Sequence, residues 1–435
     1  MLHSASKGLW ALALLALFCS STHARVTRIV IDATQAVPVA AGAASGIAYE
    51  QVAGRAFGEL DPQLPQNAII QDMALAKDAD GKVRYVASFV IYKPVNLKDA
   101  SGLMWHDVPN RGRVFPYAEQ EFAMGDIGLA SAWQGDNAGG TAVKPKATLN
   151  GLQFLQVPVA KNPDDSKITG KVFGRIVNRA GPDSQPLMVQ TNPLPYQPAS
   201  LDTAKATLVS RGRENMNGEV FDEQTIAPSD WAWAQCDAQN PFPGKPDPTQ
   251  ICLKNGFDAK RLYQVVFEAQ DPYVLGIGFA AWRDVAVFFK HAKADDTGTP
   301  NPVASAVTHS IARGVSQSGN YLCGWLHMGF NQDEVPTGSQ APRNNRMVHD
   351  GLWPIIAGRR IALNFRWAQP DGVLELYQAG SEGPQWWLPH PDKVRGLRAA
   401  GILDRCTKTN TCPKIIEHFG SAEVWALKQI GRAHV

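Results

Sequence analysis

The stretch Gly314-Val315-Ser316-Gln317-Ser318-Gly319 decides the fold that this sequence predicts. Small residues stand two positions before and two positions after Ser316, although the second is Ser318 where glycine is more usual. An apolar strand candidate, 303–313, precedes the motif, and a helix candidate, 319–330, follows it. Small flanking residues let a strand turn sharply into a helix and hold the serine in a strained, exposed conformation. The motif therefore predicts Ser316 as a nucleophile.

Ser318 is the rival nucleophile within the same motif. It would have Asn320 at the position of its second small residue, whereas Ser316 has Ser318 there, so the pattern favours Ser316. A serine hydroxyl also needs a base that takes its proton and hydrogen-bond donors for the oxyanion. These partners are sought in the rest of the chain.

Strand and loop patterns before the motif predict a mostly parallel sheet. Residues 25–95 are rich in strand patterns. Residues 101–108 and 127–133 are short apolar runs, and each is followed at once by a polar loop that contains glycine, 109–113 and 134–136. In parallel sheets the loops at the carboxyl ends of strands carry the chemistry. We therefore expect these two loops to lie beside the active site.

Residues 149–257 differ from their surroundings. They are rich in Pro, Asn, Asp and Gln and contain scattered strand-like pieces, which predicts a β-rich insertion over the active site. From residue 261 the α/β pattern is expected to return, with a strand over 261–269 and a helix over 279–291.

The first 24 residues have the composition of a secretory signal peptide. Lys7 is followed by the short apolar run 8–18, and Thr22-His23-Ala24 supplies small residues for cleavage after Ala24. We therefore expect a secreted or periplasmic protein with no membrane span. The 42 basic and 40 acidic residues form no basic stripe, so nucleic acid is not an expected partner.

Cysteine spacing predicts two local disulfides. Export favours disulfides, and the close pairs are Cys236 with Cys252 and Cys406 with Cys412. Cys323 lies among apolar residues of the helix candidate and is expected to be a buried thiol. No His stands at ligand spacing beside either pair, so neither a metal nor another cofactor is expected.

Several segments together resemble a known family. GVSQSGNYLCGWLHMGFNQDE, HDGLWPIIAG and LNFRWAQP, with AFGELDP, DVPNRGR, SAWQGD, DPYVLGIG and SAEVW, are similar to exported bacterial α/β-hydrolase-domain proteins over most of the chain. Asn320 departs from the Arg usual in that family. The resemblance implies an α/β-hydrolase fold and a secreted serine hydrolase of the esterase type, without a settled substrate.

The oxyanion donors are expected from position in this fold. One is the backbone N–H of Gln317, the residue after the nucleophile, and the second comes from the loop after an earlier central strand. The matching loop here is Asn110-Arg111-Gly112. Arg111 has two interpretations of equal weight, a partner for a substrate carboxylate or a structural salt bridge.

Glu423 is the expected catalytic acid. It follows the strand candidate 413–420 in the order serine, acid, histidine, and it resembles the Glu of the family's small-small-Glu-aromatic-Trp segment, although Val424 replaces the aromatic residue. Asp350 is the alternative acid, and Glu423 could instead cap a helix.

A catalytic histidine is not evident. Only His434 follows the acid, whereas His309 and His327 are expected in the core or on the surface, and His106 and His390 could face a cleft. Too few residues follow Glu423 for the last strand and a His loop. We therefore expect a hydrolase domain over 25–429 that lacks the last part of its sheet and is inactive as written, and a read-through tail over 430–435.

Three functional hypotheses remain. The first is a hydrolase that forms an acyl-enzyme on Ser316 with a small-molecule or polymer ester as substrate. The second is a non-catalytic module that keeps the hydrolase scaffold and binds carbohydrate or another ligand through Trp-rich loops. The third is a metal-dependent hydrolase, which the lack of a His cluster argues against. The acyl group, leaving group and oligomeric state are not encoded in any motif.

Overall fold

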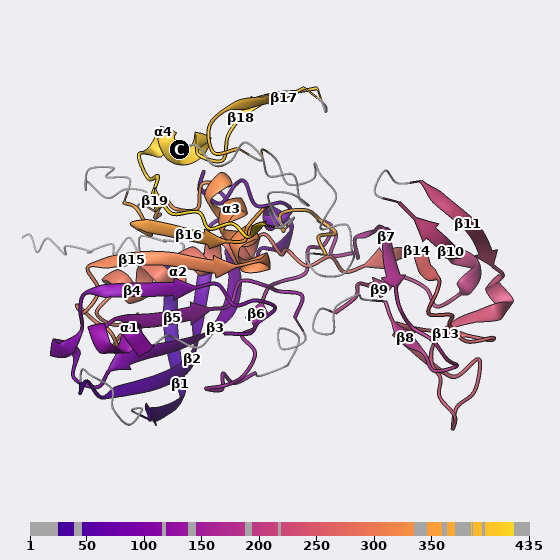
Figure 1. The fold of residues 1–435 in the computed structure, drawn as a ribbon, viewed down its shortest axis with the longest axis horizontal. Helices are drawn as coiled ribbons and strands as arrows, with labels where there is room; N and C mark the ends of the chain where they lie inside the picture. Colours follow the sequence, from indigo (N-terminus) through magenta and orange to yellow (C-terminus); the bar gives the residue numbers. More distant parts are fainter. Residues whose placement is uncertain are drawn as a thin grey trace, which may run out of the picture.

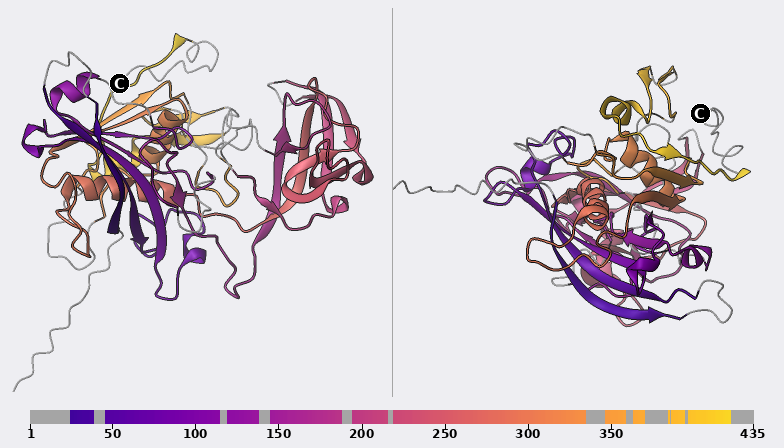
Figure 2. Two further views of the ribbon diagram at one scale, coloured as in Figure 1. Left: turned by 90° about the horizontal axis from the view of Figure 1, so that it is seen from below. Right: turned by 90° about the vertical axis from the view of Figure 1, so that its left-hand side faces the viewer.

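The computed structural model describes residues 25–38, 46–114, 119–137, 145–187, 194–215, 219–334, 346–358, 363–369, 384, 386–393 and 396–421. Figure 1 shows a large sheet with helices on one side of the picture and a smaller group of sheets on the other. Both are also separate in the left-hand view of Figure 2.

The described residues form a nine-stranded central sheet in the order β1-β2-β3-β5-β4-β15-β16-β19, with β6 beside β3. Its strands are β1 (Arg25–Val37), β2 (Tyr49–Leu60), β3 (Val83–Pro94), β4 (Leu103–Asp107), β5 (Ile127–Ser131), β6 (Leu155–Gln156), β15 (His309–Val315), β16 (Gly351–Ile355) and β19 (Lys414–Ile415). The strands from β5 to β19 are parallel, as the sequence predicts. The first three strands pair antiparallel, so the whole sheet is mixed.

The strand order reverses at β4. The chain enters β5 on one side of β4 and later places β15 on its other side. Connections from two neighbouring parallel strands then leave in opposite directions, which opens a crevice at their carboxyl ends. The strand order therefore predicts a crevice beyond Asp107 of β4 and Val315 of β15.

Two helices cover the sheet and form its main core. Helix α2 (Ile277–His291) packs on β1, β2 and β3, and α3 (Gln317–His327) packs on β15 and β16. Nearly every residue of α2 is buried. Trp282 of α2 meets Tyr321 and Trp325 of α3 edge to face, with ring centroids 5.7 and 5.1 Å apart. These aromatic contacts fix α3 against the sheet and so fix the turn that precedes it.

The remaining described helices are short, with three to six residues each. They are α1 (Glu119–Met124), α4 (Asp404–Thr409) and the 3-10 turns η1 (Met73–Ala76), η2 (Leu97–Asp99), η4 (Thr203–Lys205) and η5 (Pro228–Asp230). No helix among the described ranges is long and apolar enough to cross a membrane.

The smaller sheets come from the middle of the chain. A five-stranded sheet has the order β11-β10-β14-β7 with β9 beside β14, and a three-stranded sheet has the order β12-β13-β8. Their strands are β7 (Thr169–Ile176), β8 (Gln185–Pro186), β9 (Gln197–Pro198), β10 (Thr207–Glu214), β11 (Val220–Ile226), β12 (Trp231–Gln235), β13 (Lys245–Leu253) and β14 (Leu262–Gln270). A separate hairpin joins β17 (His390–Asp392) and β18 (Leu397–Ala400).

The β-rich character expected for 149–257 is present, because strands β6 to β13 all lie within that range, but the sheets that they join differ from the expectation. Residues 155–156 pair with β3 of the central sheet. The strand expected at 261–269 forms as β14, yet it pairs with β10 and β7 of the five-stranded sheet and not with the central sheet. An apolar strand pattern does not reveal which sheet a strand joins, since both sheets bury one face.

Both predicted disulfide pairs are bonded. Cys236 and Cys252 are joined within the pair of strands β12 and β13, and Cys406 and Cys412 are joined across the end of α4. Cys323 is buried in α3 and takes part in neither bond. The first bond closes the Pro-rich loop between β12 and β13.

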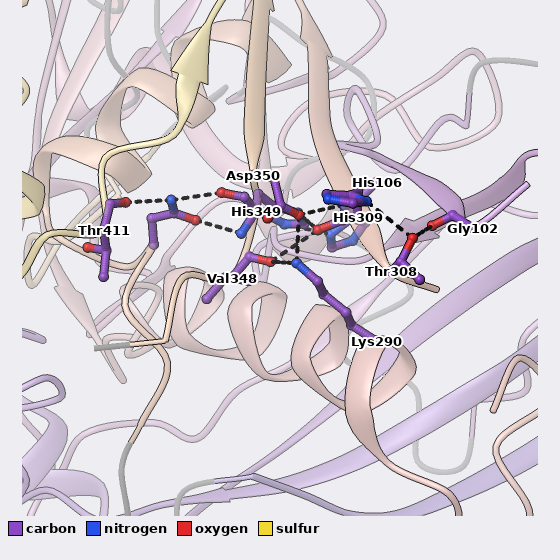
Figure 3. A network of polar contacts seen from close by, with 11 residues as sticks. Gly102, His106, Lys290, Thr308, His309, Val348, His349, Asp350 and Thr411 are labelled. Atoms are coloured by element: carbon purple, nitrogen blue, oxygen red, sulfur yellow. Dashed lines mark hydrogen bonds and ion pairs between the residues drawn. The ribbon is translucent and has the colours of Figure 1, made fainter. Parts of the chain in front are cut away.

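A buried histidine chain crosses the main core (Figure 3). His106 Nδ1 lies 3.3 Å from His349 Nε2, and His106 Nε2 lies 2.8 Å from Ser131 Oγ. His349 Nδ1 continues the chain to Ser310 Oγ at 3.0 Å. His106 also stacks on Trp282 at 3.9 Å. His106 is fully buried, so the expectation that it could face a cleft is wrong.

The buried pair His106 and His349 predicts that the fold loses stability in acid. Burial lowers the pKa of His349 to about 3, and burial lowers the pKa of His106 well below its usual value. The unfolded chain takes up these protons near pH 6.5, so stability is lost as the pH falls below that value. One such group costs about 2 kcal/mol between pH 7 and pH 5. Urea titrations at pH 7 and pH 5 measure the free energy of unfolding. Between these two pH values, His349→Asn should lose about 2 kcal/mol less of it than the wild type does. An equal loss would contradict the neutral histidine.

Candidate active site

Ser316 occupies the turn between β15 and α3, as the sequence predicts. It is the residue before the first turn of α3 and has φ 60° and ψ −118°. A non-glycine residue reaches this region only when its surroundings hold it there. The Ser316 side chain is exposed, and its backbone N–H donates to Ile355 O of β16 at 2.9 Å. The hydroxyl is thus presented beyond the carboxyl end of the central strand.

The small residues of the motif are required by close backbone approach. A Cβ on Gly314 would stand 2.5 Å from Ser318 O, and a Cβ on Gly319 would stand 2.7 Å from Ala357 Cβ. Real Cβ atoms essentially never come within 3.0 Å of another heavy atom in this way. The turn therefore needs glycine at both positions, 314 and 319.

The Asn110-Arg111-Gly112 loop lies beside Ser316, which agrees with the expected place of the second donor. Asn110 Nδ2 donates to Val315 O at 3.3 Å, and the backbone N–H of Arg111 donates to Gln317 Oε1 at 3.2 Å. Arg111 and Gly112 both have positive φ, 50° and 81°. The left-handed backbone turns the Arg111 N–H toward the start of α3.

Gln317 and Ser318 carry polar atoms that are buried without a partner among the described residues. These atoms are Gln317 Nε2 and Ser318 Oγ. Gln317 also begins α3, where backbone N–H groups have no acceptor within the helix. The start of α3 therefore presents donors beside the Ser316 hydroxyl.

The turn after β5 adds polar residues that sequence reasoning did not place in the site. Gln134, Asp136 and Asn137 are all at least nine-tenths buried. A Cβ on Gly112 would stand 3.3 Å from Asn137 Nδ2, so this turn lies against the Asn110–Gly112 loop. The sequence predicted that the polar loop after the strand at 127–133 lies beside the active site, but it predicted no role for any residue of that loop.

A semi-buried ion pair supports the floor of the site. Arg313 of β15 donates to both carboxylate oxygens of Asp107 of β4, at 2.7 and 3.0 Å, and it also pairs with Glu121. Hydrogen bonds to these carboxylates favour the charged guanidinium, so the pKa of Arg313 is raised despite burial. The pair ties the ends of the two strands between which the crevice opens.

Neither expected acid is brought to Ser316 by the described residues. Glu423 lies outside them, and so does His434. Asp350 is wrong as the alternative acid because it stands at the amino end of β16, where it accepts from Lys290 Nζ at 2.7 Å and from Ser310 N at 2.8 Å. In a parallel sheet that end is opposite to the carboxyl end that presents Ser316.

The segment after β19 runs toward the site. His418 forms a parallel bridge with Ile355, and its carbonyl accepts from Ile356 N at 2.7 Å. The Ile355 carbonyl also accepts from Ser316 N, so Ile355 lies between His418 and Ser316. The backbones at His418 and Ser316 are therefore about two strand spacings apart, ~10 Å. Glu423, the expected acid, follows His418 in the sequence after four intervening residues.

Three of the described histidines, His309, His327 and His390, belong to other elements than the turn of Ser316. His309 lies at the amino end of β15 and His327 ends α3, as expected. His390 belongs to the β17–β18 hairpin. Among the described residues no group of three His, Cys, Asp or Glu side chains has the arrangement of a metal site.

This combination of a reversed strand order, a strained serine between a central strand and a helix, and amide donors beside it defines the α/β-hydrolase class. A family model described as the alpha/beta hydrolase domain matches residues 104–434. The chain therefore belongs to the alpha/beta hydrolase domain family. Comparisons with curated proteins and with solved structures gave no match.

Proposed function

We propose that this protein is a secreted serine hydrolase that cleaves carboxylic esters through an acyl-enzyme on Ser316. The backbone of Ser316 is the observation that carries the proposal. A strained, exposed serine at the switch point of the sheet has a conformational cost of about 1–3 kcal/mol, and catalysis is the common reason for such a cost.

The proposed chemistry uses the neighbours of Ser316. A base removes the hydroxyl proton as Oγ attacks the ester carbonyl, and the tetrahedral intermediate collapses when the alcohol leaves with that proton. Water then attacks the acyl-enzyme and releases the acid. The backbone N–H groups of Gln317 and Arg111 would hold the oxyanion. The substrate oxygen would replace Gln317 Oε1 as the acceptor for Arg111.

We assign the acid to Glu423, in the segment that continues from β19, and the base to a histidine after it in the chain order of such hydrolases. No metal or other cofactor takes part in this mechanism. For Arg111 we propose only that its backbone N–H donates to the oxyanion. Its side-chain Nη1 donates a hydrogen bond to Asn110 Oδ1 at 2.9 Å within the same loop.

We further propose that residues 1–24 direct export and are removed. Two disulfides support this assignment, because such bonds persist in oxidising compartments. The hydrolase domain would then begin at Arg25, and the sheets from β7 to β14 would be its insertion.

A substrate panel tests the proposal. The purified protein would be assayed on aryl, alkyl, sugar and polymer esters, and we expect saturable hydrolysis of at least one ester without added metal. A protein that binds a carbohydrate of the panel but hydrolyses none of its esters would favour the non-catalytic alternative.

A further inference from the structure

Two side-chain amides beside Ser316 are buried with unused hydrogen-bonding groups. Asn137 Oδ1, Asn137 Nδ2 and Gln317 Nε2 have no partner among the described residues. A buried polar group without a partner destabilises the folded state, because it has lost its hydrogen bonds to water. Such groups are rare in native proteins and call for a reason, such as a ligand that satisfies them.

The side-chain amides of Asn137 and Gln317 both lie against the Asn110–Gly112 loop. Gln317 Oε1 accepts from Arg111 N, and Asn137 Nδ2 lies against Gly112, the next residue of that loop. Gln317 directly follows Ser316 in the chain. A group bound by both amides would therefore lie next to the ester carbonyl that Ser316 attacks.

An aromatic cluster lies near the turn that carries Asn137. Tyr196 contacts Tyr273, with ring centroids 6.2 Å apart, and contacts Trp367 edge to face at 5.0 Å. The backbone N–H of Leu194 donates to Asp136 O at 2.7 Å, which attaches this segment to the turn. Tyr273 and Trp367 remain partly exposed.

Charge limits what the place can bind. Asp136 adjoins Asn137, and its negative charge, after burial, helps to raise the pKa of both Tyr196 and Tyr273. A second anion would be repelled there. The unpartnered groups are neutral amides that supply both donors and acceptors, which matches neutral hydroxyl groups.

We propose that Asn137 and Gln317 form a subsite for a neutral, polyhydroxylated part of the substrate, such as a sugar ring, whose apolar face packs on Tyr273 and Trp367. This inference rests on the proposed function, because the bound group is taken to be part of the ester that Ser316 attacks. It narrows the substrate to esters of neutral sugars or similar polyols.

The first test compares two esters of the same acyl group. Methyl 6-O-acetyl-glucopyranoside and cyclohexylmethyl acetate share a primary acetate on a six-membered ring, and only the first has ring hydroxyls. We expect the wild-type full-length protein to prefer the sugar ester in kcat/KM. In Asn137→Leu this preference should fall about 2- to 100-fold, the range for one or two lost neutral hydrogen bonds. An unchanged preference in the variant would overturn the subsite.

A stability measurement accompanies the kinetics. Asn137→Leu should keep or raise the melting temperature, because it removes buried groups that have no partner. Asn331→Leu is the matched control, because buried Asn331 donates to His349 O at 3.1 Å and Thr411 O at 2.7 Å and accepts from His349 N at 2.8 Å. The control should melt well below the wild type. A similar loss in Asn137→Leu would show that Asn137 is structural and would overturn the subsite.

A binding arm separates the subsite from catalysis. Methyl glucopyranoside at about 100 mM should raise the melting temperature of the wild type and not that of Asn137→Leu. If this protection is seen and neither ester is hydrolysed, the subsite stands and the proposed esterase function is wrong. If both esters are hydrolysed without protection or preference, the esterase stands and the subsite is wrong.

Discussion

Replacing Ser316 with alanine in the full-length protein is expected to lower kcat for its best ester by about 10³- to 10⁶-fold. The variant keeps the turn, because alanine is smaller than serine and the backbone N–H still donates to Ile355 O. Hydrolysis without the nucleophile would proceed only through the oxyanion donors and binding. Steady-state rates on purified protein, with circular dichroism to confirm folding, measure the effect.

Ser318→Ala is the matched control in the same turn. Ser318 Oγ is buried and has no partner among the described residues, so its removal should cost neither activity nor stability. We expect kcat within a few-fold of the wild type. If Ser318→Ala is inactive and Ser316→Ala is active, the nucleophile has been assigned to the wrong serine.

Arg283→Met is expected to destabilise the fold severely, by about 3–5 kcal/mol. Arg283 is fully buried in α2, where its Nε donates to Asp284 Oδ1 at 2.8 Å and its Nη2 pairs with Glu334. Burial raises the pKa of both carboxyl groups. Methionine would leave two buried carboxyl groups without a counter-charge. Denaturant unfolding at pH 7 measures the loss.

Arg84→Met is the control for this buried cluster. Arg84 also bridges two carboxylates, Asp78 and Asp80, but all three side chains are about half exposed. Exposed pairs contribute little, so its unfolding free energy should stay close to that of the wild type. The deficit of Arg283→Met should shrink as the pH falls, because the orphaned carboxyl groups then take up protons in the native state. A deficit that is independent of pH would point to lost packing instead.

The sequence predicted the centre of the site because that centre is encoded locally. Gly314, Ser316 and Gly319 are close together in the chain, and a Cβ on either glycine would stand 2.9 Å from a backbone atom of the other within this turn. The position of the Asn110–Gly112 loop also followed, because it directly succeeds a strand and strand ends of a parallel sheet meet at one edge. Both disulfides could be predicted because each joins cysteines that are close in sequence.

Features that depend on long-range pairing could not be predicted in the same way. The strand at 261–269 has an apolar pattern that suits either sheet, and only its pairing with β10 and β7 assigns it. Asn137 follows an expected strand, yet its burial against Gly112 requires the fold. The burial of His106 could not be foreseen because its partner, His349, is distant in sequence.

Labelling with a fluorophosphonate probe tests the central claim most directly. The probe phosphonylates an activated serine, and mass spectrometry of the digested full-length protein identifies the modified residue. We predict a single adduct on Ser316, which is absent from Ser316→Ala and retained in Ser318→Ala. Labelling that is absent from a folded, full-length protein, or that falls on another serine, would contradict Ser316 as the nucleophile of this hydrolase.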